Sequence, residues 1–219
     1  MHSRLLFWRF KPMVKLGLMW VSLILLPLVA FSSHAASTIL VYGDSLSAAY
    51  GLSTQQGWVS LMDQRLKTER LPYQVVNASI SGETTAGGLS RLKQTIATQK
   101  PRVMILALGA NDGLRGLPIE AMQHNLSRML EMAKQNNITV LLVGMRIPPN
   151  YGPQYTQAFH QIFIDLAKQF KVKLVPFLLE NVAGKPTLNQ NDGIHPTAEA
   201  QPIILDTVWK PLQTILNKK

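Results

Sequence analysis

Residues 102–109 read RVMILALG and residues 138–144 read ITVLLVG. Both runs are apolar nearly throughout, which is how a strand reads when helices cover both faces of its sheet. Three further runs end in glycine, serine or proline and complete a set of five predicted strands. They are TILVYG at 38–43, YQVVNAS at 73–79 and VKLVP at 172–176.

Amphipathic stretches separate these strands. Apolar residues recur at helical spacing from Trp58, from Ile119 and from Tyr155, and each set predicts a helix with one core-facing stripe. A last helix is predicted over about residues 197–216, where Pro202 and Pro211 should bend or break it.

Alternating strands and helices predict βαβ units and therefore the α/β fold class. The simplest arrangement is a three-layer αβα sandwich around a five-stranded parallel sheet in the flavodoxin-like order 2-1-3-4-5. Ligands of such sheets lie beyond the carboxyl ends of the strands. Functional residues are therefore expected directly after the predicted strands.

Composition limits the functional classes. The chain has 219 residues, 47% of them hydrophobic, which suits one domain with a substantial core. The absence of cysteine excludes disulfides, thiolate metal sites and a cysteine nucleophile. The formal net charge is +10, yet no dense basic run with interleaved aromatic residues is present, so nucleic-acid binding is not expected. The positive charge suits a solvated surface, an anionic substrate or transient contact with membrane lipids.

The N-terminus has the layout of a secretory signal peptide. Arg4, Arg9, Lys11 and Lys15 precede an apolar run over 16–31, and small residues follow at 32–36. We expect a signal peptide over 1–35 and an exported domain over 36–219. The alternative is an uncleaved membrane anchor, but the run is shorter than the about 20 residues of a spanning helix and contains a proline.

The first predicted strand ends in Gly43-Asp44-Ser45. Ser45 would lie where the strand turns into the next helix, and the free N–H groups of a helix start favour developing negative charge. Such a position suits a nucleophile. Asp and Ser after a strand are also common helix caps, so this observation alone leaves both interpretations open.

Two more candidates follow neighbouring strands. Gly82 comes after the second strand and Asn111 after the third, and in the predicted order these strands lie on either side of the first. The N–H groups of Gly82 and Ser45 and the amide of Asn111 would then supply three donors to one oxyanion. Alternatively, Gly82 is an ordinary turn glycine and Asn111 caps its loop.

Among the histidines, His195 stands apart because it lies in a turn-forming segment, NDGIHP at 191–196, with Asp192 three residues before it. An imidazole can accept the proton of an attacking serine, and a carboxylate can hold the ring in the required tautomer. His124 and His160 lie in helical patterns that suit a surface or boundary role. No metal-ligand spacing, G-x-G-x-x-G or P-loop is present, so neither metal nor cofactor is expected.

Four blocks of sequence together resemble the SGNH/GDSL hydrolases: GDSLS at 43–47, SISGET at 79–84, GAND at 109–112 and DGIHP at 192–196. The resemblance covers nearly everything after residue 37 and is strongest to the periplasmic bacterial thioesterases, lysophospholipases and arylesterases. It implies that Ser45, Asp192 and His195 are catalytic and that Gly82 and Asn111 complete the oxyanion hole.

The resemblance further implies a periplasmic serine hydrolase that cleaves acyl esters and thioesters through an acyl-enzyme. We also expect a monomer. Its loops at 113–117 and 146–155 would discriminate between small-molecule substrates. Two alternatives remain: an exported carbohydrate acetylesterase, or a non-catalytic lipid- or sugar-binding protein on the same fold. The α/β-hydrolase design is set aside because no serine lies in a G-x-S-x-G elbow.

Overall fold

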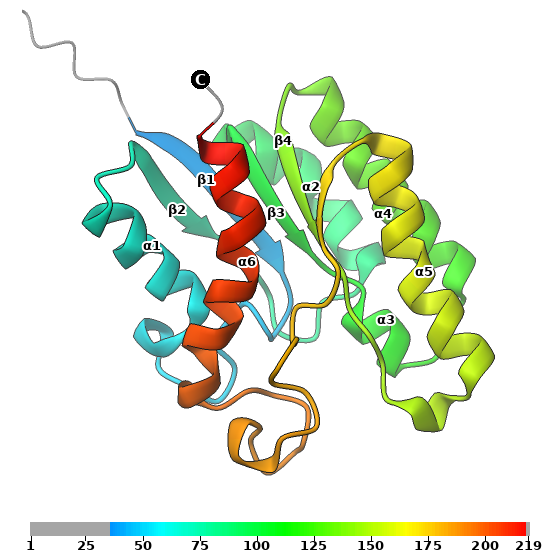
Figure 1. Ribbon diagram of the computed structural model, residues 1–219. Coiled ribbons are helices and arrows are strands. Elements are labelled where there is room, and N and C mark those ends of the chain that lie inside the picture. The colour runs from blue at the N-terminus through cyan, green and yellow to red at the C-terminus, as the bar shows by residue number, and fades with distance from the viewer. Residues whose placement is uncertain (1–35, 218–219) are drawn as a thin grey trace, which may run out of the picture. The chain divides into compact units, whose positions relative to one another are not determined.

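The computed structural model describes residues 36–217, so the predicted signal peptide over 1–35 lies outside the described residues. Five parallel strands form one sheet in the order β2-β1-β3-β4-β5, which confirms the predicted topology (Figure 1). The strands are β1 (Ser37–Gly43), β2 (Tyr73–Asn77), β3 (Val103–Ala107), β4 (Thr139–Val143) and β5 (Lys173–Val175).

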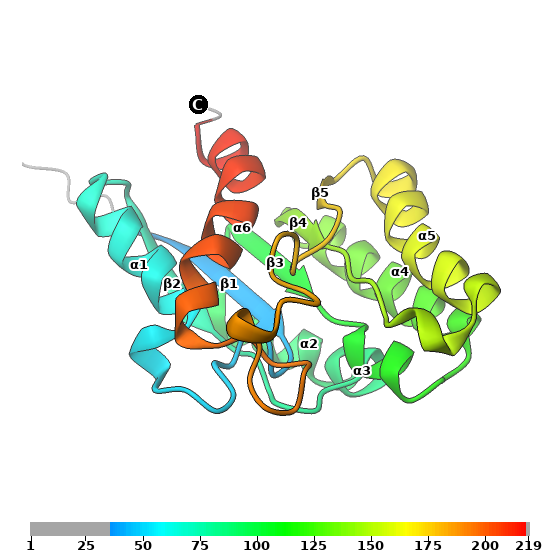
Figure 2. The ribbon, with the colours of Figure 1, turned by 60° about the horizontal axis from the view of Figure 1, so that its bottom comes forward.

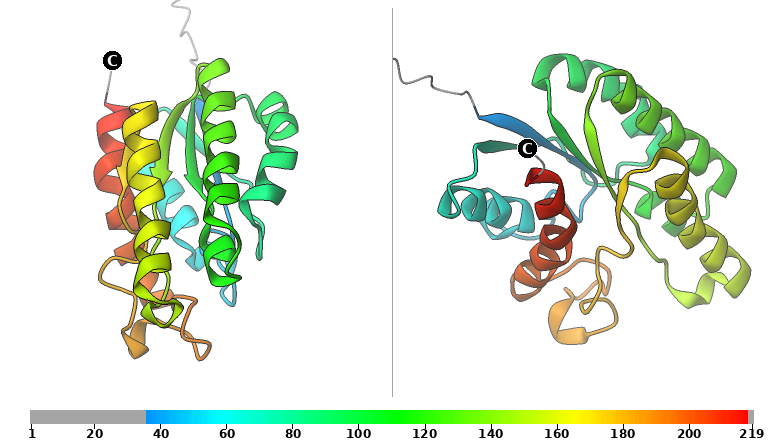
Figure 3. Two further views of the ribbon diagram at one scale, coloured as in Figure 1. Left: turned by 90° about the vertical axis from the view of Figure 1, so that its right-hand side faces the viewer. Right: turned by 45° about the horizontal axis from the view of Figure 1, so that its top comes forward.

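Helices cover both faces of the sheet. They are α1 (Trp58–Thr68), α2 (Thr85–Gln99), α3 (Ala110–Leu114), α4 (Ile119–Gln135), α5 (Pro153–Phe170) and α6 (Gln201–Leu216). Helices α1 and α6 pack together on one face, and α2 and α4 pack together on the other, as the edge-on view of Figure 3 shows. Helix α5 packs beside α4 and against β4 and β5. The predicted three-layer sandwich is therefore confirmed.

The core lies between these layers. Every residue of β3 is buried, as expected for a strand covered on both faces. The three predicted stripes also point into the core: Trp58 of α1, Met122 of α4 and Phe159 of α5 are each almost fully buried. Their periodicity reflects packing, since burying large apolar side chains supplies the dominant favourable term in folding.

The sequence pattern did not predict helix α2. Only Leu92 and Ile96 are buried hydrophobic residues in it, and the rest of its inner face consists of Thr85 and Gly88. A methyl group on Gly88 would come within 2.4 Å of a Leu108 methyl, so the helix lies close to the sheet. Small residues allow that approach and at the same time weaken the hydrophobic periodicity.

The predicted break in the last helix is wrong. A 3-10 turn (Ala198–Ala200) precedes α6, and Pro202 lies in the first turn of α6, where its missing N–H costs nothing. Pro211 lies inside the helix without ending it. Buried side chains on both sides of it, among them Trp209 and Leu212, hold this helix against the protein and offset the lost hydrogen bond.

The second strand ends two residues earlier than predicted. The side chain of Asn77 accepts a hydrogen bond from the N–H of Ser79 at 3.1 Å, although the N–H groups of Ala78 and Ile80 still donate to carbonyls of β1. The segments that follow the five strands gather at the carboxyl edge of the sheet, which Figure 2 brings forward. There the loop after β1 lies beside the long segment between β5 and α6.

Candidate active site

Ser45 follows β1 in a run of turns, and α1 begins only at Trp58. The expectation that Ser45 lies at the start of a helix is therefore wrong. Asp44 organises the turn instead: its backbone carbonyl accepts from the N–H groups of Ser47 and Ala48, and its side chain accepts from the N–H of Leu46 at 3.0 Å. Asp44 caps no helix, and its hydrogen bonds instead hold the turn that contains Ser45.

Asp44 itself is buried, with an exposed fraction of 2%. Burial raises the pKa of this carboxyl group to about 7, because removing a carboxylate from water disfavours its charged form. The hydrogen bond from Leu46 opposes the shift only partly. Asp44 does not line the cavity that contains Ser45, and its role is to hold the turn.

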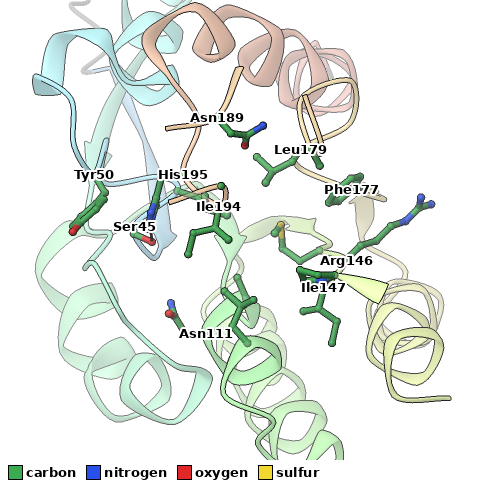
Figure 4. Close-up of a pocket in the computed structure, with 18 of the residues that line it drawn as sticks. Ser45, Tyr50, Asn111, Arg146, Ile147, Phe177, Leu179, Asn189, Ile194 and His195 are labelled. Atoms are coloured by element: carbon green, nitrogen blue, oxygen red, sulfur yellow. Dashed lines mark hydrogen bonds between the residues drawn. The ribbon is translucent and has the colours of Figure 1, made fainter. Parts of the chain in front are cut away.

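The structure brings Ser45 and His195 together although 150 residues separate them. Nε2 of His195 lies 2.9 Å from Oγ of Ser45 (Figure 4). Nδ1 of the same ring lies 2.7 Å from Oδ2 of Asp192. Both are hydrogen-bond distances, so one chain of contacts runs from the carboxylate through the imidazole to the hydroxyl. This is the geometry that proton transfer from an attacking serine requires.

Asp192 also builds its own turn. Its Oδ1 accepts from the N–H groups of Ile194 and His195, each at 3.0 Å, and Gly193, which follows Asp192 directly, adopts a positive φ of 73°. Partial burial raises the pKa of this carboxyl group, but the hydrogen bonds from the backbone and ring of His195 and from Ile194 outweigh it and lower the pKa to about 2. Asp192 is thus ionised at neutral pH.

Asn111 lies in the first turn of α3, and its amide donates to the carbonyl of Glu83 at 3.0 Å. A carboxamide has two N–H donors, so this contact orients the group and leaves one donor for a ligand. Gly82 adopts a positive φ of 76°, a conformation that favours glycine. Within residues 36–217, the N–H groups of Ser45 and Gly82 make no hydrogen bond to another residue.

These residues line one cavity of about 710 Å³ at the carboxyl edge of the sheet. Ser45, Gly82, Asn111 and His195 all belong to it. The remaining wall is mostly apolar and includes Leu46, Leu114, Met145, Ile147, Pro148, Phe177 and Leu179. Figure 4 shows Tyr50 and Ser45 at one side, and Arg146 with Phe177 at the other.

The sequence predicted part of this wall. Residues 146–149 line the cavity, as expected for the 146–155 loop, whereas only Leu114 does so from the 113–117 loop. The segment that provides Phe177, Leu179 and Ala183 was missed. It carries no motif, and the one available signal was its length, since the long connection between β5 and α6 had no predicted helix or strand of its own.

Other site classes have less support. Among the described residues, no group of three or more His, Asp or Glu side chains is placed to hold a metal ion. No helix within residues 36–217 combines the length and apolar character needed to cross a bilayer.

Comparison with known proteins agrees with this geometry. Residues 41–202 match the GDSL-like lipase/acylhydrolase family. The chain is 50% identical over 182 residues to Esterase TesA of Pseudomonas aeruginosa, covering 83% of this chain and 90% of that protein. It is 43% identical over 192 residues to Thioesterase 1/protease 1/lysophospholipase L1 of Escherichia coli K12, covering 88% and 91%.

Solved structures give the same result. A crystal structure of TesA superimposes with a TM-score of 0.80 at 50% identity and covers 82% of this chain and 99% of that chain. The psychrotrophic esterase EstA from Pseudoalteromonas, solved with monoethylphosphonate as inhibitor, gives a TM-score of 0.80 at 41% identity, with 83% and 100% covered. From the matched sequence, the shared fold and the four blocks around its cavity, the chain belongs to the GDSL-like lipase/acylhydrolase family.

Proposed function

We propose that Ser45, His195 and Asp192 form the catalytic triad of a hydrolase that cleaves acyl esters and thioesters. The observation that carries this proposal is the continuous contact from Asp192 through His195 to Ser45, at 2.7 and 2.9 Å. The imidazole takes the proton of Ser45 as the hydroxyl attacks the acyl carbon, and it returns this proton to the leaving alcohol or thiol. The ionised Asp192 keeps the proton on Nδ1 and stabilises the imidazolium.

The oxyanion of the tetrahedral intermediate needs donors, and three candidate donors belong to residues that line the cavity beside Ser45. They are the N–H groups of Ser45 and Gly82 and the free N–H of the Asn111 amide. Collapse of the intermediate leaves the acyl group on Ser45. Water then attacks this acyl-enzyme with His195 as base, and release of the carboxylic acid restores the hydroxyl.

The apolar wall of the cavity favours substrates with a fatty-acyl chain. An acyl chain that leaves Ser45 toward Ile147, Phe177 and Leu179 would bury apolar surface, which favours its binding. Esterase, thioesterase and lysophospholipase are also the names of the similar proteins. We therefore place fatty-acyl thioesters, lysophospholipids and aryl esters before acetylated sugars, whose acetyl group would leave most of this wall uncovered.

Hydrolysis of p-nitrophenyl acyl esters tests the triad. We expect turnover by the wild type and a fall of at least about 10³-fold in kcat for Ser45→Ala, because the nucleophile is lost. The variant should keep the wild-type circular dichroism spectrum. Near-normal activity of Ser45→Ala would exclude Ser45 as nucleophile.

A panel of acyl-CoA, lysophospholipid, aryl-ester and acetyl-sugar substrates tests the substrate class. The proposal expects kcat/KM to rise with acyl length as the cavity fills, by up to about 10-fold for each well-buried pair of methylene groups. A clear maximum for acetylated sugars would instead identify a carbohydrate acetylesterase.

We also propose that the protein is exported to the periplasm as a monomer after removal of residues 1–35. The basic residues, apolar run and small residues of the N-terminus support the export and the cleavage. N-terminal sequencing of protein recovered from cells should begin near Ala36, and light scattering should give the mass of one chain. A start at Met1 or Met13 would contradict the proposed processing.

A further inference from the structure

Gln190 contacts both segments that carry the proposed catalytic residues. Its side-chain amide donates to the carbonyl of Tyr50 at 2.9 Å and to the carbonyl of Pro196 at 3.0 Å. Its backbone N–H donates to the carbonyl of His195 at 2.7 Å. One residue therefore joins the turn after Ser45 to the turn that ends with His195.

Tyr50 forms the second part of this connection. Its ring packs against the imidazole of His195, with the ring centroids 4.4 Å apart and the planes inclined by 35°. Half of the Tyr50 side chain is exposed, so burial in the core does not explain its position. Figure 4 shows the ring beside His195 on the side away from the apolar wall of the cavity.

The next residue shows how tightly the two segments approach. Gly51 has a positive φ of 74°, and a methyl group built on it would come within 2.2 Å of Oε1 of Gln190. Glycine is therefore required here both for the backbone conformation and for the space that Gln190 occupies.

We propose that Gln190 and Tyr50 form a clamp that holds the imidazole of His195 in line with Ser45. Both are positioning residues: Gln190 fixes the separation of the two turns, and the Tyr50 ring restricts rotation of the imidazole. The inference rests on the proposed function, because it concerns the alignment of the same base and nucleophile.

A clamp is needed because the 2.9 Å contact between His195 and Ser45 joins two separate loops, and it is kept only if other contacts hold these loops together. The Asp192 turn orients the imidazole within its own segment but does not fix that segment relative to Ser45. Gln190 supplies this connection with two donors from one amide. A displacement of about 1 Å at such a contact can cost about 100-fold in rate.

Gln190→Met tests the clamp, because methionine keeps the length and volume of the side chain but has no N–H donor. The matched control is Gln74→Met, which removes one amide contact, to Thr38, at the amino edge of the sheet. We would measure kcat and KM with a p-nitrophenyl acyl ester as substrate, at a temperature well below the unfolding temperature of each variant. The rate at which a fluorophosphonate labels Ser45 is measured in parallel.

We expect kcat and the labelling rate of Gln190→Met to fall together by about 10- to 100-fold, while KM changes by less than about 2-fold. Gln74→Met should behave as the wild type in all three measurements. Wild-type kcat in folded Gln190→Met would overturn the inference, even if its melting temperature is lower. Absence of turnover by the wild type would overturn the proposed function itself.

Tyr50→Ala gives a second, independent variant, which should fold because the side chain is half exposed. Its kcat should fall by about 10-fold, and Tyr50→Phe should restore activity because the packed ring is kept. If the two residues act as one clamp, the double variant Tyr50→Ala/Gln190→Met should lose little more than the worse single variant. Fully multiplicative losses would show that they do not act together.

Discussion

Asp192 divides two tasks between its two oxygens. Oδ1 accepts the N–H groups that shape the turn, and Oδ2 faces Nδ1 of His195. In Asp192→Asn the side-chain carbonyl can still accept the N–H groups of the turn, but the side-chain NH₂ donates to Nδ1 of His195. The ring proton then lies on Nε2, the atom that must accept the proton of Ser45. We expect kcat to fall by about 10³- to 10⁴-fold with an unchanged melting temperature. Steady-state kinetics checks this, and a fall below 10-fold would contradict the assigned role.

One N–H of the Asn111 amide donates to the backbone of Glu83, and in the proposed mechanism the other donates to the oxyanion. Asn111→Ala should lower kcat by about 10²- to 10³-fold, since one oxyanion donor is lost. Asn136→Ala is the control, because its amide also donates to a backbone carbonyl, that of Met132, but at the exposed end of α4. Equal effects of the two substitutions on kcat would show that Asn111 serves only the fold.

At the scale of elements, the residues that follow β4 and β5 lie in close contact. A methyl group on Gly144 would come within 2.5 Å of the carbonyl oxygen of Pro176, a backbone atom that cannot turn away. Gly144→Ala should therefore lower the free energy of unfolding by about 1–3 kcal/mol, and Gly144→Val by more. Urea denaturation measures both. Wild-type stability of Gly144→Val would show that the two strand ends separate easily.

At the scale of the whole molecule, Asp44 should make the free energy of unfolding depend on pH. Its pKa is raised in the folded state to about 7, so between about pH 4 and pH 7 the folded protein binds a proton that the unfolded chain has released. Stability should then fall as pH rises through this window, by up to about 4 kcal/mol from this group. Asp44→Asn should flatten this slope in urea denaturation at several pH values. An unchanged slope would exclude Asp44 as its origin.

The local pattern of the chain was sufficient for most of the fold. Apolar runs predicted five strands, helical spacing predicted α1, α4 and α5, and the order of elements predicted the parallel sheet. The predictions failed where tertiary packing, rather than the local sequence pattern, determines the element. Helix α2 has a small-residue face because it lies close to the sheet, and α6 continues past Pro211 because buried neighbours hold it.

The sequence by itself determined the family, the fold class and the identity of the five candidate site residues, because each block of residues is contiguous and each strand end is marked by its own composition. Only the tertiary structure decided which side chains meet. The apolar wall from Phe177 to Ala183 and the link from Gln190 to Tyr50 join parts of the chain that are distant in sequence. Such contacts depend on how the loops pack in space, and no local pattern of residues encodes that packing.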